Sequence, residues 1–356
     1  MLESQDAKKQ VILKKEWAMF IPKSIIHLFP DKANSGRNPA ISIPDDRELH
    51  NPKTRIVFTE NTMIHIQLPQ KEIAGVPLRN HLLLAAGILG TTGASLKRML
   101  SLGAGGVVTK SIGPVPIPGH HGPTLVPVDG GLINAMGLPN PSKDFTAEIS
   151  PLAGEPVIVS IFGGTPEEFG EVASWFPDAL AFELNLSCPH AEGYGAAIGV
   201  NPQIVRECTE IVKTYNKPVW VKLTPNVTDI KGIGKAAEKG GADALVAINT
   251  VKAMRISTGA RRPVLGNTFG GLSGKAIFPI AVRSIYDLYD AVSIPIIGCG
   301  GVSTADNVLE MMMAGASAVE IGSAVYDSIN VFSEIAAELY AEDGTPAEEI
   351  VGCAHV

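Results

Sequence analysis

The sequence predicts an α/β protein, a (β/α)8 (TIM) barrel preceded by an amino-terminal extension. From residue 64 onward, apolar strand-like runs alternate with amphipathic helix-like stretches, a rhythm typical of parallel sheets. Eight such runs occur, the number that closes a barrel. The first run leads into Ala85-Ala86-Gly87-Ile88-Leu89-Gly90, which does not fit the G-x-G-x-x-G turn of a doubly wound sheet. These observations favour a closed barrel over an open sheet.

The expected strands are almost continuously apolar, as strands buried on both faces should be. They cover residues 82–86, 106–111, 157–162, 181–186, 219–223, 244–249, 295–298 and 318–322. Three of them follow the same turn, in which Gly103, Gly241 or Gly315 stands where a helix should end. Glycine accepts the left-handed conformation that ends a helix, so these turns predict direct helix-to-strand connections.

The predicted helices have recognisable starts. The run 165–168 (TPEE) is a capping box with proline at the first helical position, and Asn201-Pro202 opens the next helix. Ser303 with Asp306 is expected to open another. At the other end of the barrel, residues 64–70 and 76–78 could pair as a hairpin that plugs the bottom.

Residues 1–62 form the predicted extension, ahead of a barrel domain over 63–356. They are richer in Lys, Asp, Asn and Pro and lack the strand–helix rhythm. The stretch 14–29 mixes bulky apolar and basic residues, so it could be a surface helix that touches a membrane or a partner. Because Pro22 interrupts this stretch, we favour an extension that packs on the outside of the barrel.

Composition narrows the function. The formal net charge is −7 and no basic stripe is present, so we expect a small-molecule ligand rather than nucleic acid. None of the four cysteines forms a CxxC pair, so neither a structural zinc site nor a cysteine-ligated iron–sulfur cluster is predicted, and no metal is expected. Sparse cysteines, a charged amino terminus and the lack of an apolar run near ~20 residues indicate a cytoplasmic protein.

Barrel active sites lie at the carboxyl ends of the strands, and these ends are polar here. Glycines follow the last two strands at Gly300, Gly301 and Gly322, beside Ser323. They would let backbone N–H groups approach a phosphate, next to a helix start at Ser303. The alternative is a pair of tight turns that bind nothing. Cys299 is expected to pack within the first turn.

Two lysines, Lys110 and Lys222, also end strands at this mouth. A buried lysine needs a partner. That partner could be a cofactor bearing negative charge, such as a flavin that gains a hydride, or a barrel carboxylate such as Glu183.

Cys188 follows the fourth strand and opens a glycine-rich loop. A cysteine needs its pKa lowered from ~8.5 to act as a thiolate or base near neutrality, and nearby lysines could supply that. The alternative, a buried inert cysteine, suits Cys208 better. His190 could tune the cysteine or bind substrate, although a lone histidine is more often structural. The amides Asn134, Asn185 and Asn249 suit a planar ligand with alternating donors and acceptors, such as a pyrimidine.

The order of these motifs resembles one family. The matching segments are VVTKS (107–111), NAMGLPN (134–140), NLSCP (185–189), VKLTPNVTDI (221–230), INT (248–250), GGLSG (270–274), IIGCGG (296–301) and IGSA (321–324). From residue 64 to its end, the chain resembles the class 1 dihydroorotate dehydrogenases, most closely their 1B branch. This resemblance implies FMN as cofactor and the oxidation of (S)-dihydroorotate to orotate in pyrimidine (UMP) synthesis.

The resemblance also implies residue roles. Cys188 would be the base that removes the C5 proton, while hydride leaves C6 for flavin N5. Substrate would bind Lys110, Asn134, Ala135, Met136, Gly137, Leu138, Asn185, Asn249 and Thr250, with the orotate carboxylate on the backbone of 136–138. FMN would contact Ala86, Lys110, Ser111, Ser160, Asn185, Lys222, Ile248 and Gly274, with its phosphate at Gly300, Gly301, Gly322 and Ser323.

Alternatives stay open at this point. His190 stands where many class 1 enzymes have asparagine, and Cys-Pro-His also occurs in the flavin domain of dihydropyrimidine dehydrogenases, which act on uracil and thymine. A third reading is a barrel that binds ligand without catalysis. Class 1B relatives pass electrons to a partner subunit with FAD and an iron–sulfur cluster, so such a partner is expected. The expected assembly is a homodimer of this chain or a heterotetramer with the partner. Fumarate or a quinone could also be the acceptor.

Overall fold

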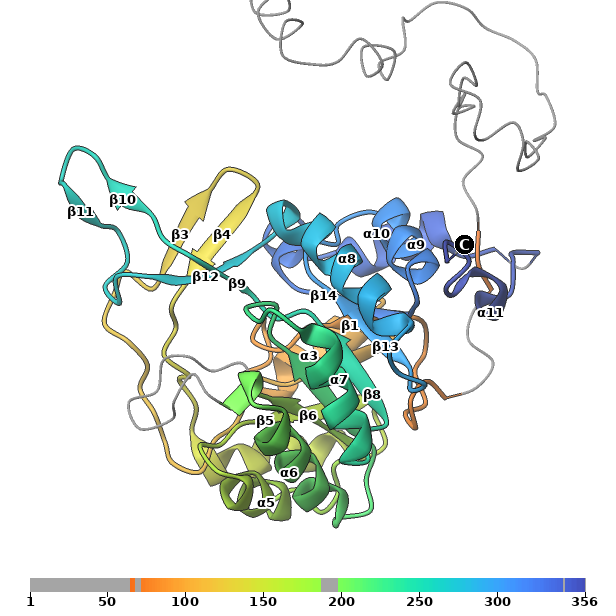
Figure 1. Ribbon diagram of the computed structural model, residues 1–356, viewed down its shortest axis with the longest axis horizontal. Helices are drawn as coiled ribbons and strands as arrows, with labels where there is room; N and C mark the ends of the chain where they lie inside the picture. Colours follow the sequence, from red (N-terminus) through yellow and green to blue (C-terminus); the bar gives the residue numbers. More distant parts are fainter. Residues whose placement is uncertain (1–64, 68–71, 187–197, 342, 356) are drawn as a thin grey trace, which may run out of the picture. The chain divides into compact units, whose positions relative to one another are not determined.

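The computed structural model of the chain describes residues 65–67, 72–186, 198–341 and 343–355. The predicted extension, Cys188 and His190 lie outside the described residues. Eight parallel strands close into a barrel in the order β1-β14-β13-β8-β7-β6-β5-β2 (Figure 1). These strands are β1 Leu82–Leu84, β2 Gly106–Val108, β5 Val157–Ile161, β6 Ala181–Asn185, β7 Val219–Leu223, β8 Ala244–Ala247, β13 Ile296–Cys299 and β14 Ala316–Ile321. The predicted (β/α)8 fold is confirmed.

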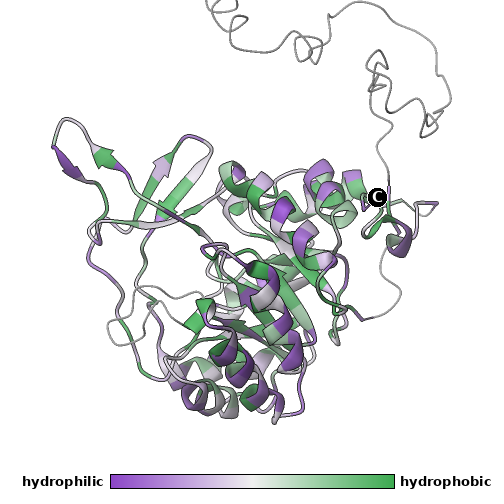
Figure 2. Ribbon diagram, viewed as in Figure 1, coloured by the Kyte–Doolittle hydropathy of each residue, from purple (hydrophilic) through white to green (hydrophobic). Residues whose placement is uncertain are grey.

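Helices alternate with the barrel strands and surround them. The α-helices are α3 Gly93–Ser101, α4 Thr146–Ile149, α5 Pro166–Ser174, α6 Pro202–Lys213, α7 Ile230–Lys239, α8 Phe278–Tyr289, α9 Ala305–Met313, α10 Val331–Leu339 and α11 Ala347–Ile350. Short 3-10 helices occur at η1 Ser142–Phe145, η2 Ser150–Leu152, η3 Ile198–Val200, η4 Lys275–Ile277 and η5 Ser323–Tyr326. Figure 2 shows apolar strands enclosed by helices that carry polar residues outward.

Most of the predicted turns are confirmed. Gly103, Gly241 and Gly315 have φ values of 101°, 89° and 119°, so each takes the left-handed conformation after its helix. The Asn201 side chain accepts hydrogen bonds from the first turn of α6. The start of α9 differs from the prediction, because Thr304 rather than Ser303 is the N-cap and accepts from the Asn307 N–H.

The barrel interior is a distinct hydrophobic cluster. Every strand contributes a buried side chain to it, which only the inside of a closed barrel allows. Its members are Val76, Leu78, Leu83, Ala85, Val108, Ile158, Ala181, Trp220, Ala244, Val246, Ile297, Cys299 and Ala318. Strand residues of the opposite parity point outward and pack against the helices.

The bottom of the barrel is closed differently from the prediction. Val76 and Leu78 do plug the interior, and Val76 pairs with Ile73 in a tight turn. Ile66, however, bridges Tyr340 and Thr345 rather than the plug. The expected hairpin between 64–70 and 76–78 is therefore wrong, because the carboxyl-terminal segment supplies the backbone partners of Ile66.

A small antiparallel sheet, which was not predicted, stands beside the barrel mouth (Figure 1). It comprises β3 Leu125–Val128, β4 Gly131–Asn134, β12 Gly270–Ser273 and β9 Val251–Ala253, in that order. A hairpin of β10 Ile256–Ser257 and β11 Arg262–Pro263 extends from it. Among the described residues, no helix has the length and apolarity needed to cross a membrane.

Candidate active site

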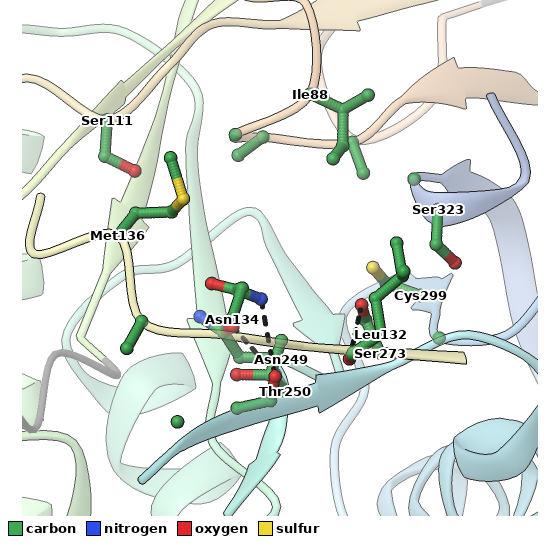
Figure 3. Close-up of a pocket in the computed structure, with 18 of the residues that line it drawn as sticks. Ile88, Ser111, Leu132, Asn134, Met136, Asn249, Thr250, Ser273, Cys299 and Ser323 are labelled. Atoms are coloured by element: carbon green, nitrogen blue, oxygen red, sulfur yellow. Dashed lines mark hydrogen bonds between the residues drawn. The ribbon is translucent and has the colours of Figure 1, made fainter. Parts of the chain in front are cut away.

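A cavity of about 510 Å³ opens between the carboxyl ends of the barrel strands and the small sheet. The barrel contributes residues at or just after the ends of β1, β2, β6, β7, β8, β13 and β14, and the sheet contributes residues of β4 and β12. Figure 3 shows Ser323 and Cys299 at one side of the cavity and Ser111 and Met136 at the other. Asn134, Asn249 and Thr250 lie between these two sides.

Nearly all the described residues predicted for the site line this one cavity. They are Ala86, Lys110, Ser111, Asn134, Ala135, Met136, Gly137, Leu138, Asn185, Lys222, Ile248, Asn249, Thr250, Gly274, Gly300, Gly301, Gly322 and Ser323. Ser160 does not line it; its side chain is fully buried behind Ser111, with 2.9 Å between the two hydroxyl oxygens. Cys188 lies outside the described residues, three positions after Asn185.

The side of the cavity near Ser323 is formed by backbone turns. Gly300 and Gly301 have φ values of 128° and 81°, which only glycine adopts at little cost. A Cβ atom on Gly301 would lie 2.7 Å from Phe278 Cβ and 2.9 Å from the Gly274 carbonyl. The turn at Gly301 therefore packs directly on the backbone at Gly274, and Gly322 lines the same cavity. Such a surface suits an anion that binds backbone N–H groups.

A hydrogen-bonded chain of polar side chains runs from Asn249, between the two sides, to Ser111 on the side opposite Ser323 (Figure 3). The Asn249 amide donates to Asn185 Oδ1 at 3.2 Å, and the Asn185 amide donates to Ser111 Oγ at 3.0 Å. Asn249 Oδ1 accepts from the Thr250 N–H at 2.7 Å. These contacts fix which atoms of each amide face outward, so the cavity wall presents defined donors and acceptors. Asn134 faces them from β4, bonded to the Gly271 carbonyl.

Residues 136–138 form a loop with unusual backbone geometry. Gly137 and Leu138 have φ values of 74° and 53°. Leu138 has a side chain, so this conformation costs about 1–3 kcal/mol and persists only where neighbours enforce it. The Asn140 amide donates to the Leu138 carbonyl at 3.0 Å, and the Met136 carbonyl accepts from the His120 N–H. Strained loops of this kind cluster at binding sites.

Lys222 reaches the cavity from inside the barrel, where it meets two carboxyl groups. Its Nζ lies 2.6 Å from Glu320 Oε2 and 3.5 Å from Glu183 Oε2. The predicted alternative, an ion pair with Glu183, is therefore present, and Glu320 is the nearer partner. Burial disfavours the charged form of Lys222, but the acidic neighbours Cys299, Glu183 and Glu320 raise its pKa above the ordinary value. Cys299 faces this cluster, and burial raises the pKa of its thiol to about 12.

Several residues at the site were not found from the sequence. Glu320 was missed, although a charged residue at an inward position of an apolar strand was a usable signal. Asn226 was also missed; its amide donates to the Thr250 carbonyl and its Oδ1 accepts from the Lys252 N–H. Leu132, Gly271 and Ser273 line the cavity from the sheet. Among the described residues, no group of three or more potential metal ligands occurs.

The fold and the cavity define the class of protein: a (β/α)8-barrel enzyme whose site lies at the carboxyl ends of its strands. The family model for dihydroorotate dehydrogenase matches residues 69–342. Curated relatives named dihydroorotate dehydrogenase B (NAD(+)), catalytic subunit, are similar over most of their length. The Methanocella arvoryzae protein is 56% identical over 79% of this chain and 96% of its own. The Methanosarcina mazei protein is 57% identical over 80% of this chain and 94% of its own.

A Pyrococcus abyssi relative with the same name is 51% identical over 79% of this chain and 97% of its own. A crystal structure of a dihydroorotate dehydrogenase with ferulenol from Eimeria tenella has a TM-score of 0.66 and covers 75% of this chain and 82% of that one. At 20% identity, this likeness concerns the fold alone. The chain belongs to the dihydroorotate dehydrogenase family, within the branch of the B-type catalytic subunits, as its motifs predicted.

Proposed function

We propose that this chain oxidises (S)-dihydroorotate to orotate with FMN as the hydride acceptor, in pyrimidine biosynthesis. The observation that carries the proposal is the single cavity, which gathers every described site residue implied by the resemblance except Ser160. Family membership supplies the reaction class. The uracil-type alternative is not favoured, because the relatives reported above are all dihydroorotate dehydrogenases.

The cavity fits FMN by its shape and chemistry. The glycine turns at Gly300, Gly301 and Gly322 can receive a phosphate on backbone N–H groups, next to the Ser323 hydroxyl. Lys222 and Lys110 line the same cavity and can balance negative charge on a ring system. Bound FMN would supply the electron-pair acceptor for the reaction. Ser160 would support the site indirectly, by holding Ser111.

The substrate would lie on the side opposite the phosphate. The polar chain of Asn185 and Asn249 faces Asn134 across the cavity, and these amides can bind the carbonyl and N–H groups of a pyrimidine ring. The strained loop 136–138 can receive the substrate carboxylate on its backbone, as the resemblance implies. A uracil ligand lacks that carboxylate and would leave the loop without a partner.

Cys188 would take the C5 proton. It follows Asn185, a residue of the cavity wall, by three positions, and the lysines of the cavity can lower the pKa of a nearby thiol. Cys299 is unsuited to this role, since burial keeps it a neutral thiol near pH 7.

The proposal includes a partner and a location. The relatives are named catalytic subunits, which favours a second subunit. We propose that it carries FAD and an iron–sulfur cluster, in a heterotetramer, and that electrons reach NAD through it. The described cysteines, Cys208, Cys299 and Cys353, are all free thiols, which suits a cytoplasmic location. Full NAD-coupled activity of the purified chain alone would argue against the partner.

The test is an anaerobic titration of the purified, FMN-loaded chain. Dihydroorotate should bleach the flavin band, and dihydrouracil should not. A flavin that stays oxidised with dihydroorotate would overturn the assignment. In the same assay, Cys188→Ser should keep FMN but slow the bleaching severely at neutral pH, because serine is a far weaker base. Cys353→Ser, at an exposed cysteine, is the matched control and should behave like the unmodified chain.

A further inference from the structure

An acidic pair lies inside the barrel beneath the cavity. Glu183 on β6 and Glu320 on β14 are 0% and 1% exposed. Barrel interiors are normally filled by apolar side chains, and the neighbouring interior positions here follow that rule with Ala85, Val108 and Val246. Burying an ionic cluster rarely improves stability over apolar packing. The pair is therefore better explained by what it does for Lys222.

The charges in this cluster do not balance if both acids are ionised. Lys222 contributes one positive charge, and it contacts Glu320 at 2.6 Å and Glu183 at 3.5 Å. Two carboxylates would leave the cluster with a net negative charge under a cavity proposed to hold anionic ligands. In a poorly screened interior such a charge would repel them. One proton on the pair removes this charge.

The hydrogen bonds point to the same proton. Glu183 Oε2 and Glu320 Oε1 are buried and have no hydrogen-bond partner among the described residues; Lys222 Nζ approaches Glu183 Oε2 as an ion pair, at 3.5 Å. Buried polar atoms nearly always have a partner. Both carboxyl groups converge on Lys222 Nζ, at 3.5 Å and 2.6 Å, so a proton on one of them can supply the donor that the other lacks.

The surrounding groups favour Glu183 as the site of that proton. Glu320 is the closer partner of Lys222, whose ammonium group donates to Glu320 Oε2 at 2.6 Å. Glu183 has a weak donor in the Ser160 hydroxyl at 3.4 Å. Burial and the charge of Glu320 raise the pKa of Glu183 well above its ordinary range, against the opposing effect of Lys222. Cys299, the remaining titratable neighbour on β13, stays a neutral thiol near pH 7.

We propose that Glu183 is a neutral carboxylic acid at neutral pH, that it donates its proton to a hydrogen bond with the Glu320 carboxylate, and that Glu320 in turn fixes Lys222 Nζ toward the cavity. Both glutamates are positioning residues. They act through Lys222 and keep the unit of three side chains electrically neutral. The stored proton belongs to the protein whatever the ligand; only its effect on FMN rests on the proposed function.

Infrared spectroscopy tests the proton directly. At pH 7 the unmodified chain should show a carboxylic acid C=O band that shifts when its glutamates are labelled with ¹³C. Both Glu183→Gln and Glu320→Gln should lose this band, because either change leaves one carboxyl group to ionise opposite Lys222. The absence of the band in the unmodified chain, or its persistence in either variant, would overturn the proposal.

The midpoint potential of bound FMN gives a second readout. Glu183→Gln preserves the shape and the neutral charge, so its potential at pH 7 should match that of the unmodified chain. At alkaline pH the midpoint potential of the unmodified chain should fall below that of the variant, because loss of the Glu183 proton adds a negative charge near the flavin. A potential that is already raised in Glu183→Gln at pH 7 would mean that Glu183 is ionised, against the proposal. Failure to bind FMN would count against the proposed function alone, because the infrared band needs no flavin.

Discussion

Gly322 and Gly301 of the proposed phosphate site differ in the space available for an added methyl group. Alanine variants at these two positions can therefore distinguish an effect on ligand binding from an effect on folding. A Cβ on Gly322 would lie 3.5 Å from Ala85 Cβ and 3.7 Å from Ile88 Cγ1, which are ordinary contacts. Gly322→Ala should therefore fold normally but weaken FMN binding severalfold, because the methyl group enters the cavity. Denaturant unfolding and an FMN titration measure the two effects. Unchanged FMN affinity would remove Gly322 from the phosphate site.

Gly301→Ala is the contrasting variant. Its φ of 81° and the close approach of Phe278 and Gly274 leave no room for a methyl group. We expect it to lose about 1–3 kcal/mol of unfolding free energy before any ligand is added, the usual cost of a side chain held in such a conformation. Equal stability of the two alanine variants would contradict this reading of the turn.

The residues at the strand ends could be predicted from the sequence, but the burial of each side chain and its partners from distant parts of the chain could not. The residues after each strand were identified because parallel strands end on one face of the barrel. Ser160 was expected to contact FMN because of the family resemblance, yet its side chain is buried behind Ser111. A sequence pattern indicates which face of a strand a residue is on, but not how deeply its side chain is buried. Glu320 pairs with Lys222, 98 positions away, and no local pattern joins them.

At the scale of elements, helix α6 offers a test of capping. The Asn201 side chain accepts from the Gln203 and Ile204 N–H groups at 3.0 and 3.4 Å. Asn201→Ala should cost about 1 kcal/mol of unfolding free energy, the typical value for a lost N-cap. Asn330, the N-cap of α10, makes no such side-chain bond, so Asn330→Ala is the matched control. Equal losses in denaturant unfolding would show that capping is not the cause.

The eight barrel strands were predictable because each is a buried apolar run bounded by turn residues. The small sheet was not predictable. Its strands have at most four residues, β3 contains Pro127 and β12 begins with two glycines, so neither propensity nor alternation marks them. Its register pairs Asn134 with Gly271 across a long separation in sequence. Tertiary pairing creates this sheet, and with it one wall of the cavity.

At the scale of the whole molecule, the barrel floor joins segments from both ends of the described chain. Ile66 donates its N–H to the Leu339 carbonyl, and its own carbonyl accepts from the Ala341 N–H. Tyr340 lies between Leu339 and Ala341. Its hydroxyl oxygen accepts a hydrogen bond from the backbone N–H of His81 at 2.9 Å and lies 3.2 Å from the ring nitrogen His81 Nδ1. The hydroxyl can donate to Nδ1 only if the imidazole is neutral, because a protonated ring would present a second donor.

This arrangement predicts that the free energy of unfolding decreases at acidic pH, because the contacts of His81 at the bottom of the barrel are lost. Burial lowers the pKa of His81 from 6.5 to about 4. A depressed pKa means that the unfolded chain binds the proton first. The contribution of His81 is therefore complete above about pH 6.5 and is lost as the pH falls toward 4, by about 3 kcal/mol in all. His81→Gln removes the titration, so unfolding free energies measured between pH 7 and pH 4.5, at one FMN concentration, should fall less steeply than in the unmodified chain. His65→Gln, at an exposed histidine, should keep the original slope. If His81→Gln and the unmodified chain lost stability in parallel, the acid sensitivity would lie elsewhere, and the neutral imidazole would not be what holds the two ends of the barrel together.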